Sequence, residues 1–153
     1  MTRCMIGALK GKAAVITGGG SGIGKSMVER YLAEGASVVA ADINEASLKA
    51  LLEELEPEYG DKLKILKVNV SSKEEVEAMI DYTVEAFGKV DVVINNAGIM
   101  DNLLPIAEMP DDMWERIMNI NLNSVMYACR KAVQYFLKEN REGTIINTAS
   151  LSG

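Results

Sequence analysis

Short apolar segments alternate with longer segments of helical periodicity along almost the whole chain. The apolar segments, which we expect to be strands, fall at Lys12–Thr17, Ser37–Asp42, Leu63–Val70, Val90–Ile94 and Thr144–Thr148. Strict alternation requires right-handed crossovers and predicts an α/β fold with a doubly wound parallel sheet. The expected strand order is 3-2-1-4-5, a Rossmann-type arrangement that is incomplete at its C-terminal side.

The helices between these strands have recognisable ends and faces. Pro57 is expected to end the second helix, and Ser72 with Glu75 forms a capping box for the third, which should end at Gly88. The first helix should pack through Ile23, Met27, Tyr31 and Leu32, and the second through Leu48, Leu51, Leu52 and Leu55. A long helix over 112–140 has apolar positions at Trp114, Ile117, Met118, Leu122, Val125, Met126, Val133, Phe136 and Leu137. The segment Ala97–Asp111 is expected to be a loop near a cleft.

One junction carries a run of glycines. The sequence Thr17-Gly18-Gly19-Gly20-Ser21-Gly22-Ile23-Gly24 follows the first strand and opens a helix. A glycine turn at that junction places backbone N–H groups and a helix N-terminus where a phosphate can bind. Glycine clusters also form plain turns, so the run indicates a phosphate site only together with later segments.

Composition limits the classes of function. The chain has 153 residues, a formal net charge of −6 and 48% hydrophobic residues, which suits a single domain over residues 1–153. Neither a basic cluster nor a membrane-length apolar run is present, so we expect no nucleic-acid or membrane partner. There is no histidine, and Cys4 and Cys129 lack ligand spacing, so we expect no metal site and a reduced, cytoplasmic setting.

Asp42 ends the second predicted strand, 18 residues after Gly24. In a dinucleotide-binding fold, a carboxylate at this position accepts hydrogen bonds from both hydroxyls of the adenosine ribose. It also repels a 2′-phosphate, which favours NAD over NADP. The alternative is an aspartate that only caps the next helix. Lys25 could favour a 2′-phosphate, but we expect it to lie on the helix surface.

Five motifs together resemble the short-chain dehydrogenase/reductase family. They are the glycine run, Asp42, Asn95-Asn96-Ala97-Gly98, Asn121 in Ile120-Asn121-Leu122, and Asn147-Thr148-Ala149-Ser150. All occur in the family's order and spacing and cover nearly the whole chain. The resemblance implies an oxidoreductase that moves hydride between a nicotinamide cofactor and a carbonyl or alcohol substrate. The nearest subgroup includes acyl-carrier-protein reductases and sugar dehydrogenases.

The same resemblance implies roles for individual residues. The cofactor-binding set would be Gly18, Ser21, Gly22, Ile23, Gly24, Asp42, Asn69, Val70, Asn96, Ala97 and Gly98. Within it, Ser21 and Ile23 would contact the diphosphate, and Asn69, where the family usually has Asp, would edge the adenine with Val70. Two residues would be catalytic: Asn121 holding a water in a proton relay and Ser150 bonding the substrate oxygen. The 112–140 helix would form homodimers or homotetramers.

The family's general acid, a Tyr followed by a Lys four residues later, would lie beyond Ser150. We therefore expect a truncated domain that is silent in turnover by itself, with its fifth strand an exposed apolar edge. Tyr127 and Lys131 have the same spacing, but they precede Ser150. Six helical positions turn Tyr127 away from Asn121, so we do not expect this pair to be catalytic.

Two other functions are compatible with parts of the sequence. The segment from Gly19 to Ser26 matches the Gly-x4-Gly-Lys-Ser loop of nucleoside triphosphatases. Those enzymes also need an Asp that ends a neighbouring strand, whereas Val92-Val93-Ile94 is followed by Asn95. The other alternative is a non-catalytic NAD-binding or interaction module with the 112–140 helix as its contact surface. The substrate stays open among ketones, sugars and acyl thioesters.

Overall fold

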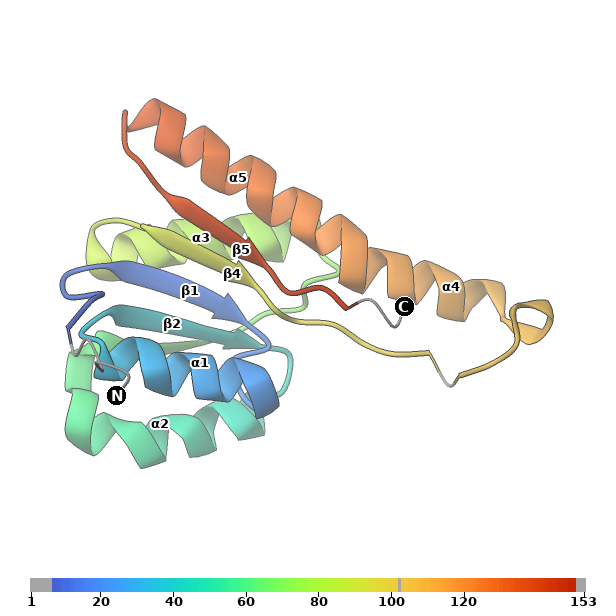
Figure 1. Cartoon of the computed structure of the whole chain (residues 1–153), viewed down its shortest axis with the longest axis horizontal. Coiled ribbons are helices and arrows are strands. Elements are labelled where there is room, and N and C mark those ends of the chain that lie inside the picture. Colours follow the sequence, from blue (N-terminus) through green and yellow to red (C-terminus); the bar gives the residue numbers. More distant parts are fainter. Residues whose placement is uncertain (1–6, 102, 151–153) are drawn as a thin grey trace, which may run out of the picture.

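A computed structural model, which describes residues 7–101 and 103–150, contains a parallel sheet with helices on both faces (Figure 1). The strands are β1 (Ala13–Thr17), β2 (Ser37–Asp42), β3 (Leu63–Lys67), β4 (Val92–Asn95) and β5 (Thr144–Asn147). They lie in the order β3-β2-β1-β4-β5, and every pair is parallel. The predicted fold class and strand order are therefore confirmed. Cys4 lies outside the described residues.

Helices α1 (Gly22–Ala33) and α2 (Glu45–Tyr59) cover one face of the sheet, and α3 (Lys73–Phe87) and α5 (Ser124–Lys138) cover the other. Alternate residues of each strand point to the two faces: Ile16 packs in the first core layer and Val15 in the second. Burial on both faces explains why the central strands read as unbroken apolar runs. None of the helices in the described part of the chain combines the length and apolar composition that crossing a bilayer requires.

Pairing between neighbours sets the ends of the strands. The third strand was expected to reach Val70 but ends at Lys67, because its partner β2 ends at Asp42, which pairs with Lys67. The fourth begins at Val92 rather than Val90. The first begins and the fifth ends one residue inside the predicted range. Ile146 on edge strand β5 is 40% exposed, as expected for an apolar edge.

The predicted helix over 112–140 is interrupted at its centre. Helix α4 (Asp111–Met118) leads through a π-helical turn, η3 (Asn119–Asn123), into α5. Figure 1 shows α4 projecting beyond the carboxyl edge of the sheet. The predicted apolar face is wrong in part, because five of its members are exposed: Trp114, Leu122, Met126, Val133 and Leu137. The inner side of α5 carries mainly small residues instead, namely Ser124, Ala128 and Ala132 with Phe136.

The proline expected to end the second helix lies inside it. Pro57 removes one backbone donor close to the end of α2, where the loss is small because Gly60 still donates to the carbonyl of Glu56 and closes the helix. A short 3₁₀ turn, η1 (Gly60–Lys62), then leads into β3. Ile23 is also not where the periodicity placed it. It is 66% exposed, because Val28 and other residues fill the inner side of α1.

The capping box predicted for α3 is half formed. Ser72 accepts a hydrogen bond from the amide of Glu75 at 3.3 Å, which caps the helix as expected. The carboxylate of Glu75 instead accepts from the amide of Asn69 at 2.7 Å. The predicted C-terminus is confirmed, because Gly88 adopts the left-handed conformation that ends helices. Glu75 therefore holds the loop before the helix.

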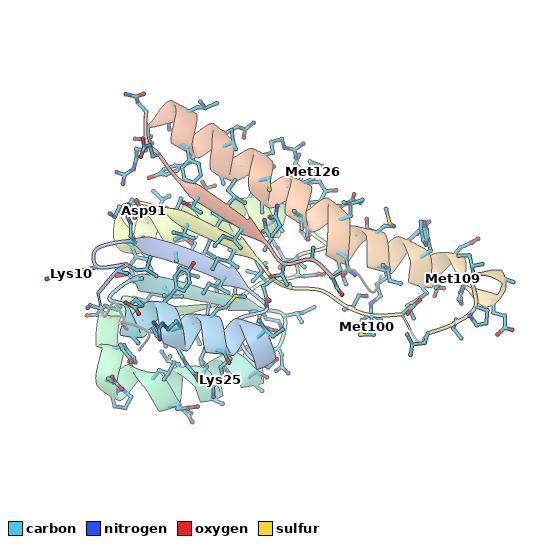
Figure 2. All side chains as sticks on the ribbon, viewed as in Figure 1. Lys10, Lys25, Asp91, Met100, Met109 and Met126 are labelled. Carbon is cyan, nitrogen blue, oxygen red and sulfur yellow. The ribbon has the colours of Figure 1, made fainter. Side chains whose placement is uncertain are left out.

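The long segment between β4 and α4 is irregular apart from a 3₁₀ turn, η2 (Ile106–Glu108). Residue 102 lies outside the described part. This segment leaves the carboxyl edge of the sheet towards the N-terminus of α4, and Met100 and Met109 lie along it (Figure 2). The loop predicted for this part of the chain is thus confirmed.

Candidate functional site

The loops that follow β1, β2, β3 and β4 line a crevice of about 420 Å³ at the carboxyl edge of the sheet. Every residue that the sequence predicted to bind a cofactor lines it: Gly18, Ser21, Gly22, Ile23, Gly24, Asp42, Asn69, Val70, Asn96, Ala97 and Gly98. The structure adds Ile43, Val68, Ile99, Arg116 and Ile120 to the lining. The residues predicted from scattered motifs therefore lie together around one crevice.

The first turn of α1 is open to an anion. Its N-cap, Ser21, makes no capping hydrogen bond, and the first turn contains no acidic residue. By contrast, Asn44 and Ser72 cap α2 and α3, and both of those helices have acidic residues in the first turn. The positive N-terminal end of the α1 dipole thus faces the crevice without a compensating group from the chain.

Two glycines allow the backbone around the crevice to pack closely. A side chain on Gly24 would collide with the carbonyl oxygen of Gly18 and with the amide of Asn96. Gly18 has φ 67°, and a Cβ there would lie 3.1 Å from the Cα of Ala97. The glycine turn is therefore tightly packed against the end of β4, which holds the open N-terminus of α1 at the centre of the crevice.

The Asp42 carboxylate is fixed towards the glycine turn. Its Oδ2 accepts a hydrogen bond from the amide of Gly20 at 3.0 Å, and its Oδ1 accepts from the amide of Asn44 at 2.9 Å. Each carboxylate oxygen has further acceptor capacity for a ligand hydroxyl. The residue that caps α2 is Asn44, which accepts from the amide of Ser47 at 3.1 Å. The reading of Asp42 as a simple helix cap is therefore wrong.

Thr17 joins the ends of β1 and β4 and was not singled out as a site residue from sequence. Its Oγ1 donates to the carbonyl of Ile94 and accepts from the amides of Asn96 and Ala97, both at 3.0 Å. The side-chain amide of Asn96 donates to the Thr17 carbonyl at 3.1 Å. The position of Thr17, last in its strand and directly before the glycines, was the available signal.

Asn95 braces the next strand pair. Its side-chain amide donates to Oδ1 of Asn147 at 2.8 Å, so the ends of β4 and β5 are joined. At the same edge, Oγ1 of Thr148 lies 3.4 Å from Oδ1 of Asn96. The edge that bears the crevice is thus held together by side-chain hydrogen bonds from β1 to β5.

Of the two catalytic candidates, Asn121 reaches the crevice wall indirectly. Its Oδ1 accepts from the amide of Ile99 at 2.9 Å, and its Nδ2 donates to the Ile99 carbonyl at 2.8 Å. Asn121 is exposed rather than buried, and it lies in the π-helical turn η3. Ser150 follows β5, is exposed, and is not part of the crevice lining.

The residues that could have supported other functions face elsewhere. The Lys25 ammonium lies 2.6 Å from Glu54 on α2 and 3.7 Å from Glu29, and the hydrogen bond that it donates to Glu54 raises the pKa of Lys25. It is therefore not the phosphate-binding lysine of a nucleoside-triphosphate loop. On α5, Tyr127 packs in the core layer beside α3, and Lys131 pairs with Asp81 at 2.7 Å. The Tyr127–Lys131 spacing is structural.

Arg116 on α4 and Ile120 on η3 also line the crevice. Sequence reasoning assigned this stretch to core packing and named Asn121 alone as polar and functional. The available signal was spacing, because Arg116 and Ile120 are one helical turn apart and Ile120 directly precedes Asn121. Arg116 is the cation of the lining, and Asp42 is its carboxylate.

Comparison with known proteins gives consistent matches. A family model described as short chain dehydrogenase matches residues 12–153. The 3beta-hydroxysteroid dehydrogenase 2 of Eggerthella lenta is 63% identical over 145 residues, which are 95% of this chain and 55% of that protein. This chain therefore spans about half the length of that curated relative.

Solved structures also match this chain. A short chain dehydrogenase from Mycobacterium smegmatis has a TM-score of 0.89 and 39% identity, with 95% of this chain and 60% of that chain covered. A short chain dehydrogenase/reductase from Burkholderia phymatum, solved in complex with NAD, has a TM-score of 0.88 and 33% identity. That match covers 94% of this chain and 50% of the other.

Proposed function

The chain belongs to the short-chain dehydrogenase/reductase family, and on that premise we propose that it binds NAD across the carboxyl edge of its sheet as part of an oxidoreductase. The observation that carries the proposal is the Asp42 carboxylate in the same crevice as the uncapped N-terminus of α1. When bound, the cofactor supplies the hydride acceptor or donor for a carbonyl or alcohol substrate.

The lining residues suit the parts of a dinucleotide. The amides at the start of α1 would bind the diphosphate, with Gly18, Ser21, Gly22, Ile23 and Gly24 forming the turn. Asp42 would accept from the adenosine ribose, and Asn69 and Val70 would lie beside the adenine. The turn from Asn96 to Gly98 would hold the nicotinamide-side ribose.

The choice of NAD over NADP follows from charge. A 2′-phosphate on the ribose would meet the Asp42 carboxylate, which the amides of Gly20 and Asn44 hold in place. Lys25, the cation next to the glycine turn in sequence, is engaged with Glu54 and Glu29 instead. The 2′-phosphate would therefore face a negative charge with no cation from this turn.

We propose that these 153 residues bind the cofactor without turning over a substrate. Proton transfer to or from the alcohol needs a group that can titrate near the reacting oxygen. Among the residues that line the crevice, the ionisable side chains are Asp42, which is proposed to bind the ribose, and Arg116, whose guanidinium stays protonated. Ser150 would bond the substrate oxygen, and Asn121 would position the wall of the site through Ile99.

For the substrate, we propose a secondary alcohol on a rigid apolar ring system. The support is the 63% identity to a protein named as a 3beta-hydroxysteroid dehydrogenase. The segment after the nicotinamide-side turn is also apolar and accessible, with Met100 76% and Leu103 79% exposed. Such side chains can cover an apolar ligand beside the cofactor.

Calorimetric titration of the chain with NAD and NADP tests the proposal. We expect NAD to bind with 1:1 stoichiometry and NADP to bind at least about tenfold more weakly, as one unfavourable charge contact implies. No hydride transfer from a 3β-hydroxysteroid is expected above background. A folded chain that binds neither dinucleotide would overturn the proposed function. Turnover by these residues alone would overturn the proposal that they bind the cofactor without catalysis.

We also propose that helices α4 and α5 join two subunits in a homodimer or homotetramer. These two helices expose Trp114, Met126 and Val133, which are 52%, 45% and 44% accessible. Exposed apolar side chains of this size favour association. Light scattering coupled to gel filtration should give a mass of two or four chains, and Met126→Glu should reduce it to one.

A further inference from the structure

Strand β5 is an edge of the sheet, and helices cover only one of its faces. Helix α5 packs on β4 and β5, and Ile145 points into the core layer on that side. On the other face, α1 packs on β1 and β2, and α2 packs on β2 and β3. Both of these helices therefore lie over the opposite half of the sheet, away from β5.

Ile146 marks the face of β5 that these helices leave uncovered. It pairs with Ile94 on β4, and paired residues of neighbouring parallel strands point to the same face. Ile94 belongs to the core layer beside α1 and is 1% exposed, whereas Ile146 is 40% exposed. The apolar layer of the sheet thus extends to β5 and meets solvent there.

The backbone of β5 also has hydrogen-bonding groups on its outer side. The amide of Thr144 donates to the carbonyl of Asp91 at 2.9 Å, towards the neighbouring strand. Successive residues of a strand turn their backbone groups to opposite sides, so the amides of Ile145 and Asn147 point away from β4. Residues 143–150 include neither a charged residue nor a proline, which are residue types that commonly block a free edge. This edge can therefore accept a further strand.

We propose that the β5 flank, meaning the outer edge of β5 together with Ile146, binds a separate polypeptide that adds a strand to the sheet. The occupant would be similar to the part of the Eggerthella lenta relative that lies outside the match, since the match covers only 55% of that protein. The described residues already form the five-stranded sheet and both core layers. A preformed edge can bind an added strand through main-chain hydrogen bonds, without a covalent link between the two chains.

The consequence for turnover rests on the proposed function, whereas the docking itself does not. Ser150 follows β5 and is proposed to bond the substrate oxygen, so a polypeptide bound along this strand would lie beside the reacting group. The crevice lining offers only Asp42 and Arg116 as ionisable side chains. The bound polypeptide would supply the group that takes up the proton of the alcohol during hydride transfer to the cofactor.

The test combines the 153-residue chain with that part of the relative, produced as a separate chain in the same cells. We expect an equimolar complex in gel filtration coupled to light scattering. Amide hydrogen exchange, followed by NMR, should slow at least about tenfold at Ile145 and Asn147 and change less at Thr144, which already bonds to Asp91. The complex, unlike either chain alone, should oxidise a 3β-hydroxysteroid with NAD.

Ile146→Lys tests the flank directly. Because Ile146 is 40% exposed, the variant should stay folded, but a charge would replace the apolar group that the partner covers. The amount of complex recovered should fall at least about tenfold. The matched control is Ile106→Lys, on a 79% exposed residue of η2, which should leave the complex unchanged. Thermal unfolding of each variant checks that the chain is folded.

The other outcomes are separable. A folded chain that forms no complex, or a complex without slower exchange at Ile145 and Asn147, would overturn the inference. Exchange that slows at these amides as the chain alone is concentrated would also overturn it, because a second copy would then occupy the edge. A protected complex that binds NAD but oxidises no steroid would support the docking and overturn its role in turnover. A protected complex that binds neither NAD nor NADP would overturn the proposed function and support the docking.

Discussion

The carboxyl edge and the amino edge of the sheet are formed by opposite ends of the same strands, and they differ in how their polar groups are paired. At the carboxyl edge, glycines and backbone amides surround an open crevice. At the amino edge, Asp91 is buried, with a side chain 6% exposed between β1, β4 and β5. Figure 2 places Asp91 at the end of the sheet opposite Met100.

Asp91 is surrounded by donors from the chain itself. Its carboxylate accepts from the amide of Ala13 at 2.9 Å and pairs with Lys89 at 3.1 Å and Arg141 at 3.2 Å. Burial alone would raise the pKa of Asp91, but these hydrogen bonds and charges together hold it below its ordinary value of 3.8. The comparison teaches that satisfied polar groups stabilise one edge, whereas unsatisfied ones leave the other free to bind.

The largest effect is expected for Gly24→Ala, which tests whether the crevice at the carboxyl edge depends on close backbone packing. The new Cβ would overlap the Gly18 carbonyl and force the glycine turn away from β4. We expect a loss of about 3 kcal/mol in unfolding free energy and no measurable NAD binding. Gly60→Ala is the control, since Gly60 has φ 53° and open space around it. It should cost about 1–2 kcal/mol and leave binding intact.

The next largest effect is expected at the amino edge of the sheet. Asp91→Ala leaves the Ala13 amide and two cations without their acceptor, and should lower the unfolding free energy by about 2–3 kcal/mol. Lys89 and Arg141 are 31% and 38% exposed, so water recovers part of the cost. Urea unfolding measures the change. NAD affinity should not change, and a large loss of binding would contradict the division of roles between the edges.

The same carboxylate gives a pH dependence. Because the folded-state pKa of Asp91 is lowered, its contribution to stability is fully present above the unfolded value of 3.8 and is lost as the pH falls through the folded value. Unfolding free energy should therefore drop below about pH 4 in the native chain. The decline should be shallower in Asp91→Ala. Equal slopes in the two proteins would show that Asp91 does not carry the acid sensitivity.

A smaller effect is expected for Asp42→Asn, which tests the proposed ribose contact. The amide keeps one acceptor for Gly20 or Asn44 but loses the charge. NAD should bind about tenfold more weakly, and the gap between NAD and NADP should narrow. Asp61→Asn, on an exposed residue in η1, is the control and should change neither affinity.

The smallest effect is expected for Asn121→Ala. Removing the two hydrogen bonds to Ile99 should loosen the crevice wall and weaken NAD about twofold. Hydrogen exchange of the Ile99 amide should accelerate more clearly than the affinity changes. Asn123→Ala removes a hydrogen bond to Asn119 in the same π-helical turn and should leave the Ile99 amide protected.

The crevice was more predictable from sequence than the packing around it. The glycine run and Asp42 belong to strand ends, and the carboxyl ends of parallel strands meet at one edge regardless of exact boundaries. Ile23 and Trp114 were misplaced because apolar periodicity does not say which of several hydrophobic residues will face the sheet. The hydrogen bond between the Asn69 amide and the Glu75 carboxylate was not predicted, because it depends on a loop conformation that no local sequence pattern specifies.

Arg116 was missed because it lies outside every motif, on a helix whose position relative to the crevice depends on tertiary packing. Pro57 was overinterpreted, because one missing donor near a helix end costs little when the following residues close the turn. The parallel, doubly wound sheet, by contrast, followed from alternation and handedness, and the order 3-2-1-4-5 was one of the common orders compatible with them.

The π-helical turn between α4 and α5 holds one more residue per turn than the helices on either side. Deleting a single residue from it would restore regular winding and rotate α4 by about 100° relative to α5. Arg116 would then turn away from the crevice that it lines, while Ala128 and Ala132 stayed packed against the sheet. The number of residues in η3 therefore sets the direction in which α4 presents its side chains, independently of how α5 packs on the sheet.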